Sequence, residues 1–256
     1  MEKENILQEI AVRTKVRVEQ QKSVIDPAEI KTLCEAVPIG NFPFESALEG
    51  DDLSFICEVK KASPSKGIIV EDFNYVQIAK DYEEQGAAAI SVLTEPFYFQ
   101  GADSHLKEIA EAVSIPLLRK DFIVDDYMIY EAKILGASAV LLICTLLEKD
   151  ILEEYINLAH SLGLSALVET HDEDEIETAL SAGARVIGVN NRDLKTFKVD
   201  ISLSEKLRPL VPSDKIFIAE SGIRTKRDVK RMEKIGANAV LVGETLMKGK
   251  KLECLK

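Results

Sequence analysis

Short apolar stretches alternate with amphipathic helical segments from residue 53 to the end of the chain. The apolar stretches, rich in β-branched residues, are 55–59, 88–93, 116–118, 139–144, 165–168, 186–189, 216–219 and 239–242. Apolar residues at helical spacing between them predict helices that include 75–85, 127–135, 148–162, 174–182, 202–207 and 225–235. Strands that are apolar on both faces, each followed by a helix, are typical of a parallel sheet covered by helices. Eight such units predict an α/β protein of the (β/α)8 TIM-barrel class.

A weak internal repeat supports this count of units. A Gly-Ala pair precedes a predicted strand at Gly86, Gly136, Gly183 and Gly236, at intervals of 47 to 53 residues. Glycine at such a position adopts the left-handed conformation that ends a helix. Each interval holds two strand–helix units. An open, doubly wound sheet remains an alternative, although no GxGxxG motif follows any predicted strand.

A helical segment precedes the first strand. Apolar residues recur at helical spacing, for example at Ile6, Leu7 and Ile10. Asp26 and Pro27 predict a helix start, with the aspartate as N-cap and the proline at the first helical position. We therefore expect one domain, residues 1–256, in which residues 1–50 form a helical N-terminal extension packed on the barrel.

Charge limits the possible partners. The 256 residues include 32 Lys and Arg against 44 Asp and Glu, a formal net charge of −12. A field of that sign opposes nucleic acid and anionic membranes. No run approaches the ~18 apolar residues of a membrane span, and the charged N-terminal segment lacks the apolar core of a signal peptide. We expect a cytoplasmic protein with a small-molecule substrate, no nucleic-acid or membrane partner, and a sequence compatible with a monomer.

Histidine and cysteine give no metal signature. The three histidines, His105, His160 and His171, are assigned to three different predicted helices, and no HxxxH motif or Cys/His cluster occurs. The cysteines are scattered without a CxxC pair, and Cys57 and Cys144 lie in apolar runs that predict burial in the core. We expect neither a metal nor another cofactor.

Polar residues gather where the predicted strands end, which is where barrels form their active sites. The first strand carries Glu58 and Lys60, which face the same side because they lie two residues apart. Five later strands end in Arg119, Lys120 and Asp121; Glu169; Asn190, Asn191, Arg192 and Asp193; Glu220 and Ser221; and Glu244. Taken one at a time, each is explained better as a solvated loop residue. Six strand ends together favour a site.

Glu58 argues most strongly for that site, because it lies inside an apolar segment and is expected to be buried. A buried charge is costly unless it is paired. Lys60 and Lys120 are the expected partners, so that these charges neutralise one another. Such a cluster displaces pKa values, which catalytic acids and bases require.

Three loops add to the predicted site. Residues 63–67 form a loop by their proline and glycine content, and we expect a lid that holds Lys66 over the mouth. Gly222 and Gly243 follow the seventh and eighth strands, where barrels bind phosphate through backbone N–H groups; simple turns are the alternative. After the second strand, Phe97, Tyr98 and Phe99 either cover an aromatic ligand or, the favoured interpretation, pack under a neighbouring loop.

Six segments at strand ends carry a resemblance to a known family. FICEVKKASPSKGII (55–69) closely resembles the signature segment of indole-3-glycerol phosphate synthases. The resemblance continues in order through LLRKDF (117–122), LVET (167–170), IGVNNRDLKTF (187–197), IAESGI (218–223) and VGETLM (242–247). The helical extension also resembles that of the family. The resemblance implies a carboxy-lyase of tryptophan biosynthesis that closes an indole ring on 1-(o-carboxyphenylamino)-1-deoxyribulose 5-phosphate without a cofactor.

The family pattern also implies a role for each matched residue. Lys120 resembles the general acid that protonates the substrate carbonyl, and Glu169 the group that assists proton removal and stabilises the developing cation. Glu58 and Asn190 match residues that hold and polarise this centre, while Lys60 pairs with the substrate carboxylate or assists dehydration. The other matches are Phe122, which is expected to stack near the anthranilate ring, the substrate contacts Ser63, Arg192, Glu220 and Ser221, and Gly222, Gly243 and Glu244 at the phosphate.

Two other functions remain open on the same fold. A barrel aldolase would use Lys120 or Lys60 to form a Schiff base with a carbonyl substrate. A non-catalytic protein could bind phosphorylated ligands at the same predicted phosphate site without converting them, because fold does not determine function.

Overall fold

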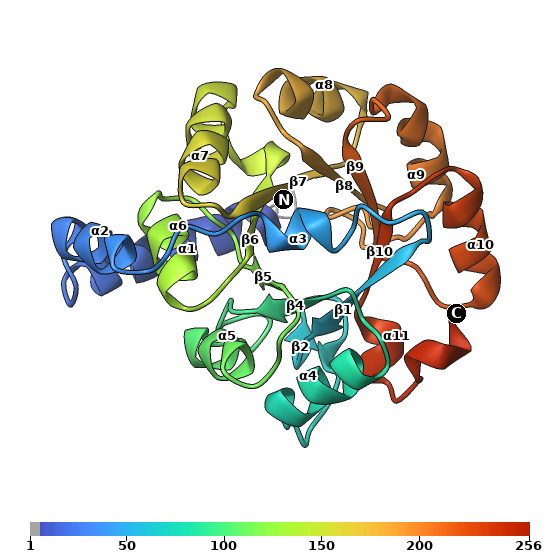
Figure 1. Ribbon diagram of the computed structural model, residues 1–256, viewed down its shortest axis with the longest axis horizontal. Coiled ribbons are helices and arrows are strands. Elements are labelled where there is room, and N and C mark those ends of the chain that lie inside the picture. The colour runs from blue at the N-terminus through green and yellow to red at the C-terminus, as the bar shows by residue number, and fades with distance from the viewer. Residues whose placement is uncertain (1–5) are drawn as a thin grey trace.

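Eight parallel strands close into a barrel in the computed structural model, which describes residues 6–256 (Figure 1). The ring closes where β1 pairs with the last strand, β10. The barrel strands are β1 (Ser54–Val59), β4 (Ala89–Leu93), β5 (Leu117–Lys120), β6 (Ala139–Ile143), β7 (Ser165–Thr170), β8 (Val186–Asn190), β9 (Ile216–Glu220) and β10 (Ala239–Val242). This closed ring confirms the predicted barrel and excludes an open sheet.

A helix follows each barrel strand and covers its outer face. These helices are α4 (Tyr75–Glu84), α5 (Asp103–Ala110), α6 (Tyr127–Ile134), α7 (Lys149–Ser161), α8 (Glu173–Ser181), α9 (Ser202–Leu207), α10 (Lys226–Lys234) and α11 (Glu244–Met247). Short 3-10 turns are η1 (Cys144–Leu146), η2 (Arg208–Leu210) and η3 (Leu252–Cys254). The glycines of the Gly-Ala repeat follow α4, α6, α8 and α10 with φ between 71° and 89°, as the sequence predicted.

Alternation along the strands divides the core in two. Ile56, Leu167 and Ile218 belong to the cluster inside the barrel. Cys57, which follows Ile56, and Phe217, which precedes Ile218, face the covering helices instead. Both sides of each strand are therefore apolar, which explains the near-continuous apolar runs in the sequence.

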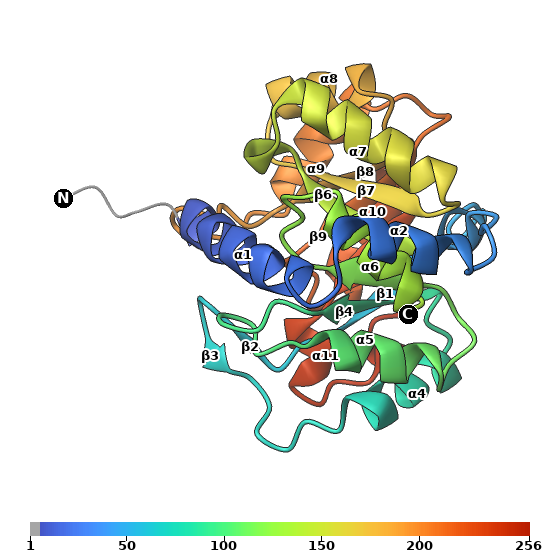
Figure 2. The same ribbon diagram turned by 90° about the vertical axis from the view of Figure 1, so that its left-hand side faces the viewer.

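The predicted N-terminal extension contains three helices, α1 (Ile6–Lys22), α2 (Pro27–Glu35) and α3 (Pro43–Ser46), and its first five residues lie outside the described residues. Asp26 caps α2 by accepting hydrogen bonds from the next turn, as predicted. Figure 1 shows α3 crossing the end of the barrel, where Phe44 is fully buried. Figure 2 shows α1 at the opposite end, beside the hairpin of β2 (Ala62–Ser63) and β3 (Gly67–Ile68).

Ion pairs fasten α1 beside β5. Arg17 lies 2.8 Å from the buried carboxylate of Asp121, and Lys22 lies 2.7 Å from Asp125. Arg119, which is fully buried, binds Asp103 at 2.7 Å and Glu131 at 2.6 Å. Buried charges of this kind require partners. The network therefore holds the residues on either side of Lys120 in place.

Several strands are longer than predicted at their carboxyl ends. Lys120, Glu169, Asn190 and Glu220 were expected to follow their strands, but each lies within one. Ladder pairing explains the extension, because Lys120 pairs with Leu93, Glu169 with Ile143, and Asn190 with Glu220. Polar side chains on rigid strands are held more precisely than side chains on loops.

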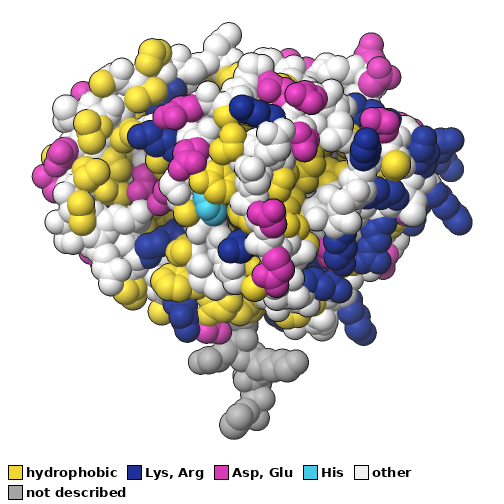
Figure 3. Space-filling model, turned by 90° about the horizontal axis from the view of Figure 1, so that it is seen from below, with side chains coloured by type: hydrophobic (Ala, Val, Ile, Leu, Met, Phe, Trp, Pro, Cys, Tyr) yellow, Lys and Arg dark blue, Asp and Glu magenta, His cyan; other side chains and the backbone are white. Residues whose placement is uncertain are grey.

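Charge is distributed unevenly over the surface. Figure 3 shows Lys and Arg side chains gathered on one side of the view, although the net charge is −12. Exposed Lys226, Arg227, Lys230 and Lys234 all lie on α10. Among residues 6–256, no helix combines the length and apolar character needed to cross a bilayer.

Candidate active site

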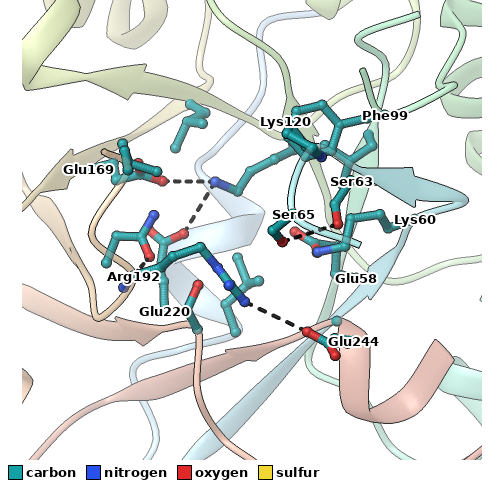
Figure 4. Close-up of a pocket in the computed structure, with 18 of the residues that line it drawn as sticks. Glu58, Lys60, Ser63, Ser65, Phe99, Lys120, Glu169, Arg192, Glu220 and Glu244 are labelled. Carbon is teal, nitrogen blue, oxygen red and sulfur yellow. Dashed lines mark hydrogen bonds and ion pairs between the residues drawn. The ribbon is translucent and has the colours of Figure 1, made fainter. Parts of the chain in front are cut away.

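A pocket opens at the carboxyl ends of the barrel strands (Figure 4). All thirteen residues that the family resemblance assigns to the site line this pocket, whereas Arg119, Asn191 and Asp193, which were also expected at strand ends, do not. Strand alternation explains their convergence. Glu58, Lys120, Glu169 and Glu220 each lie two residues beyond an apolar side chain of the barrel interior, so their side chains continue the inner face into the pocket.

Lys120 lies between two carboxylates. Its Nζ is 2.9 Å from Glu169 Oε2 and 3.3 Å from Glu220 Oε2. Figure 4 shows the lysine reaching from one side of the pocket to the two glutamates on the other. All three groups are largely withdrawn from water, since their side chains are 13%, 3% and 2% exposed. Coulombic interactions are strong in such surroundings.

This arrangement displaces the pKa of each group. Burial lowers the pKa of Lys120, but the neighbouring carboxylates outweigh burial and hold it above the ordinary value. Burial favours a higher pKa for Glu169, yet Lys120 and His171 hold it below the ordinary value. Burial, opposed by Lys120 and reinforced by Glu169, raises the pKa of Glu220 to about 7. At neutral pH the site therefore holds a charged ammonium and an ionised Glu169, beside a Glu220 that is protonated far more readily than an ordinary carboxyl.

Glu58 and Lys60 form a second ion pair on the opposite wall. Glu58 is buried, as predicted, but it is paired with Lys60 alone; Lys120, expected to share in this cluster, is paired with Glu169 and Glu220 instead. Gly243 packs directly against the pair. A Cβ at Gly243 would overlap Glu58 Oε1 and lie 3.1 Å from Lys60 Nζ. The absence of a side chain there makes room for the ion pair.

Asn190 and Arg192 connect the part of the pocket around Glu169 to its mouth. The Asn190 amide forms a hydrogen bond with Glu169, and its Oδ1 accepts a hydrogen bond from the Arg192 backbone N–H at 3.0 Å. The Arg192 guanidinium lies 3.7 Å from Glu244 Oε2, while Glu244 Oε1 binds Lys248 at 2.6 Å. Glu244 therefore turns toward cations at the rim.

The predicted phosphate end contains unusual backbone. Ser221 and Gly222, which follow β9, have φ of 64° and 87°. A Cβ at Gly222 would come within 2.7 Å of Val199 and Ile201, so this position requires glycine. Gly243 directly follows β10, and both glycines line the pocket. Barrels commonly bind phosphate through backbone N–H groups of the loops at this end of the last strands, which is where these two glycines lie.

The predicted lid is a short hairpin. Ser63 and Gly67 pair between β2 and β3, and Ser63 Oγ lies 3.5 Å from Ser65 Oγ. Lys66, at the tip, is exposed. Burial favours a higher pKa for Glu244, but its hydrogen bond with Lys248 lowers that pKa, and the charge of Lys66 lowers it further. The hairpin thus places a cation near the mouth.

An apolar wall forms the other side of the pocket. The rings of Phe122 and Phe99 lie 6.0 Å apart, and both line the pocket. Of the three aromatic residues after the second strand, Tyr98 instead packs against Arg13 and binds Glu9, while Phe97 is 56% exposed. The apolar face of α1 completes this wall with Ile6, Leu7 and Ile10. The sequence showed this face as a helix stripe but gave no sign of which element it would contact.

His171 is the residue that sequence reasoning missed. It was assigned to a predicted helix, but it lies in the loop between β7 and α8, because Asp172 caps that helix and begins it at Glu173. Its Nε2 lies 3.5 Å from Glu169 Oε1. The only available signal was its position two residues after Glu169. Within residues 6–256, no group of three or more His, Cys, Asp or Glu side chains is arranged to bind a metal ion.

Comparisons with known proteins agree with this geometry. The profile of the indole-3-glycerol phosphate synthase family matches residues 7–254. An indole-3-glycerol phosphate synthase from Ruminiclostridium cellulolyticum is 57% identical over 246 residues, covering 95% of this chain and 94% of that protein. Another, from Endomicrobium trichonymphae, is 55% identical, with 95% of each chain covered. Among solved structures, the N-acetylmannosamine-6-phosphate 2-epimerase from Clostridium perfringens shares the fold, with a TM-score of 0.60 and 17% identity over 77% of this chain and 89% of that one.

Proposed function

The chain belongs to the indole-3-glycerol phosphate synthase family, and we propose that Lys120 and Glu169 carry its ring-closing chemistry as general acid and cation-stabilising carboxylate. The reaction converts 1-(o-carboxyphenylamino)-1-deoxyribulose 5-phosphate to indole-3-glycerol phosphate, with loss of carbon dioxide and water. The observation that carries the assignment is the Lys120 ammonium held between Glu169 and Glu220 inside the pocket.

Ring closure joins the carboxylate-bearing carbon of the arene to the substrate carbonyl carbon. Lys120 is the proton donor, because its raised pKa keeps it charged until the carbonyl oxygen becomes basic. The carbonyl oxygen becomes a hydroxyl and the arene becomes a cation. Glu169 remains ionised because its pKa is lowered, so it stabilises that cation in surroundings poor in water.

Two further steps complete the product. The carboxylate leaves as carbon dioxide, and its bonding electrons restore the aromatic ring. The hydroxyl then leaves as water after protonation, while a base removes a proton from the adjacent carbon to form the indole double bond. We assign the removal of this proton to Glu169. We assign the protonation of the hydroxyl to Lys60, which is oriented by its ion pair with Glu58. Asn190 holds Glu169 through the amide hydrogen bond. One proton from solvent is consumed overall.

The substrate's two anionic ends match the cations of the pocket. Its carboxylate lies near Lys60 until it is lost. Its phosphate is bound by backbone N–H groups of Gly222 and Gly243 at the rim, and the guanidinium of Arg192 neutralises part of its charge. Phe122 packs against the anthranilate ring, and Ser63, Ser221, Glu220 and Glu244 line the remaining contacts.

The Schiff-base alternative is disfavoured by the same geometry. A lysine nucleophile must be neutral, and enzymes achieve this by apolar burial or a neighbouring cation. Lys120 is instead held charged between two carboxylates, and Lys60 is paired with Glu58.

The experiment is to incubate the purified protein with the substrate and to follow indole fluorescence. We expect turnover by the natural chain and a loss of about 10²- to 10⁴-fold in Lys120→Met, which is the usual contribution of a general acid. Lys206→Met is the matched control, because Lys206 also pairs with a glutamate, Glu173 at 3.0 Å, but on the exposed surface. Near-full activity of a folded Lys120→Met variant would overturn the assignment of the acid.

A further inference from the structure

A contact behind Glu169 has no role in the chemistry above. His171 Nε2 lies 3.5 Å from Glu169 Oε1, whereas Lys120 binds the other oxygen, Oε2. This Nε2 is buried and has no hydrogen-bond partner among the described residues. His171 does not line the pocket. It therefore contacts the catalytic carboxylate without contacting the substrate.

The other side of the imidazole is held by α8. His171 Nδ1 lies 3.1 Å from Glu175 Oε2, which also accepts a hydrogen bond from the His171 backbone N–H at 2.7 Å. Thr145 donates to the second oxygen of Glu175. A carboxylate on one ring nitrogen fixes the orientation of an imidazole and the use of its other nitrogen. Glu175 thus directs Nε2 at Glu169.

We propose that His171 is a positioning residue for ring closure, whose Nε2–H holds Glu169 Oε1 so that Oε2 stays directed at Lys120 and the reacting arene. This inference rests on the proposed role of Glu169. It connects Glu175 on α8, through His171, to the Glu169 carboxylate on β7.

The acidic groups around the His171 imidazole favour protonation of both ring nitrogens, so that each can donate a hydrogen bond. The acidic groups that face it are Glu169 from β7, Glu175 from α8 and Glu220 from β9. Burial lowers the pKa of His171, but Glu175 and Glu169 outweigh burial and raise it above the ordinary value. A protonated imidazole donates from Nδ1 and Nε2 together, which satisfies both glutamates at once.

Two matched substitutions separate positioning from a structural role. His171→Gln places an amide N–H near the position of Nε2, whereas His171→Asn places one near the position of Nδ1. If Nε2 positions Glu169, we expect His171→Gln to keep kcat within about 3-fold and His171→Asn to lose about 10-fold or more, the lower end of the effect of losing an orienting partner. KM should change little in either variant. His105→Asn, on α5 outside the pocket, is the control.

The opposite order, with His171→Asn the more active variant, would show that the ring serves only to fix Glu175 and would overturn the proposal. The kinetic pH profile gives a second readout. Removing a cation beside Glu169 should raise the pKa of that carboxylate, so the acidic limb of kcat/KM should move to higher pH in His171→Asn. An unchanged acidic limb contradicts the proposal.

A titration without substrate keeps this inference distinct from the proposed function. With only three histidines in the chain, the imidazole signal lost in His171→Asn is assigned directly by NMR. We expect that signal to titrate above the free-histidine range and to move to lower pH in Glu169→Gln. A midpoint unaffected by Glu169→Gln overturns the inference, whereas full activity of Glu169→Gln would overturn only the catalytic role of Glu169.

Discussion

Removing the charge of Lys120 should destabilise the protein in a manner that depends on pH. Lys120→Met leaves Glu169 and Glu220 facing each other, both nearly fully buried, without the ammonium that lies 2.9 Å and 3.3 Å from them. Breaking a buried pair costs about 3–5 kcal/mol when the remaining charge cannot be neutralised. For a chain of this length about 1 kcal/mol shifts Tm by roughly 2–4 °C. We therefore expect Tm to fall by about 6–20 °C at pH 8.

The decrease in Tm caused by Lys120→Met should become smaller as pH falls from 8 to 5. In the natural protein the lowered pKa of Glu169 contributes stability that is present throughout this range and is lost only at more acidic pH. In Lys120→Met, burial and Glu220 raise the pKa of Glu169, so its ionised form destabilises the fold until it is protonated. Glu220 itself has a pKa of about 7 in the natural protein, so it is neutral at pH 5 and adds no repulsion there.

The assay is thermal unfolding followed by circular dichroism at pH 5 and pH 8. Lys206→Met again serves as the control, because Lys206 and Glu173 are 68% and 58% exposed. An exposed pair contributes less than about 1 kcal/mol, so Tm should change little at either pH. A Tm difference for Lys120→Met that is equal at both pH values, or larger at pH 5, would refute the reasoning.

Three other outcomes follow from the geometry. Gly243→Ala should lower turnover at least about 10-fold, because the new methyl group displaces Glu58 from the position in which it pairs with Lys60. Gly50→Ala should leave kcat unchanged, because an added Cβ would lie 4.0 Å from its nearest neighbour, Asp52 N, and Gly50 has no strained φ. Glu220→Gln should narrow the difference in unfolding free energy between pH 5 and pH 8, because burial raises the pKa of Glu220 from 4.5 to about 7 and the natural protein therefore loses stability as pH rises between these two values; calorimetry at both pH values checks this. Cys254, the exposed thiol among four, should react alone with a thiol reagent in the folded protein, and the other three should react only after unfolding, as absorbance shows.

Much of the site followed from strand periodicity. Glu58 and Lys60 were placed on one inward face because they lie two residues apart, and Lys120, Glu169 and Glu220 were located by their positions at the ends of other predicted strands. Spacing along a strand is a local property, so the sequence determines it directly. The fold class was accessible for the same reason, because eight apolar runs with intervening helices leave few closed arrangements.

What the sequence could not show depends on contacts between distant elements. The choice of Glu220 rather than Glu58 as the second partner of Lys120 follows from the order of strands around the ring and the reach of one side chain. The side of the barrel contacted by α1 depends on buried ion pairs such as Arg17 with Asp121, whose residues lie 104 positions apart. His171 was missed because a histidine near a helix start has no pattern until its neighbours are known.

In the mechanism proposed above, the pairing of Lys120 with Glu169 lets Lys120 donate a proton without a charge penalty. Before the reaction, the Glu169 carboxylate faces the ammonium of Lys120; after proton transfer, that ammonium is neutral and the positive charge lies on the arene beside the same carboxylate. The field that stabilises the ground state therefore stabilises the product of the step, and the surrounding dipoles need little reorganisation. A glutamate that faced only the lysine, and not the arene, would stabilise the positive charge before the proton transfer but not after it. The position of Glu169, rather than its charge alone, is thus what the neighbouring side chains must preserve.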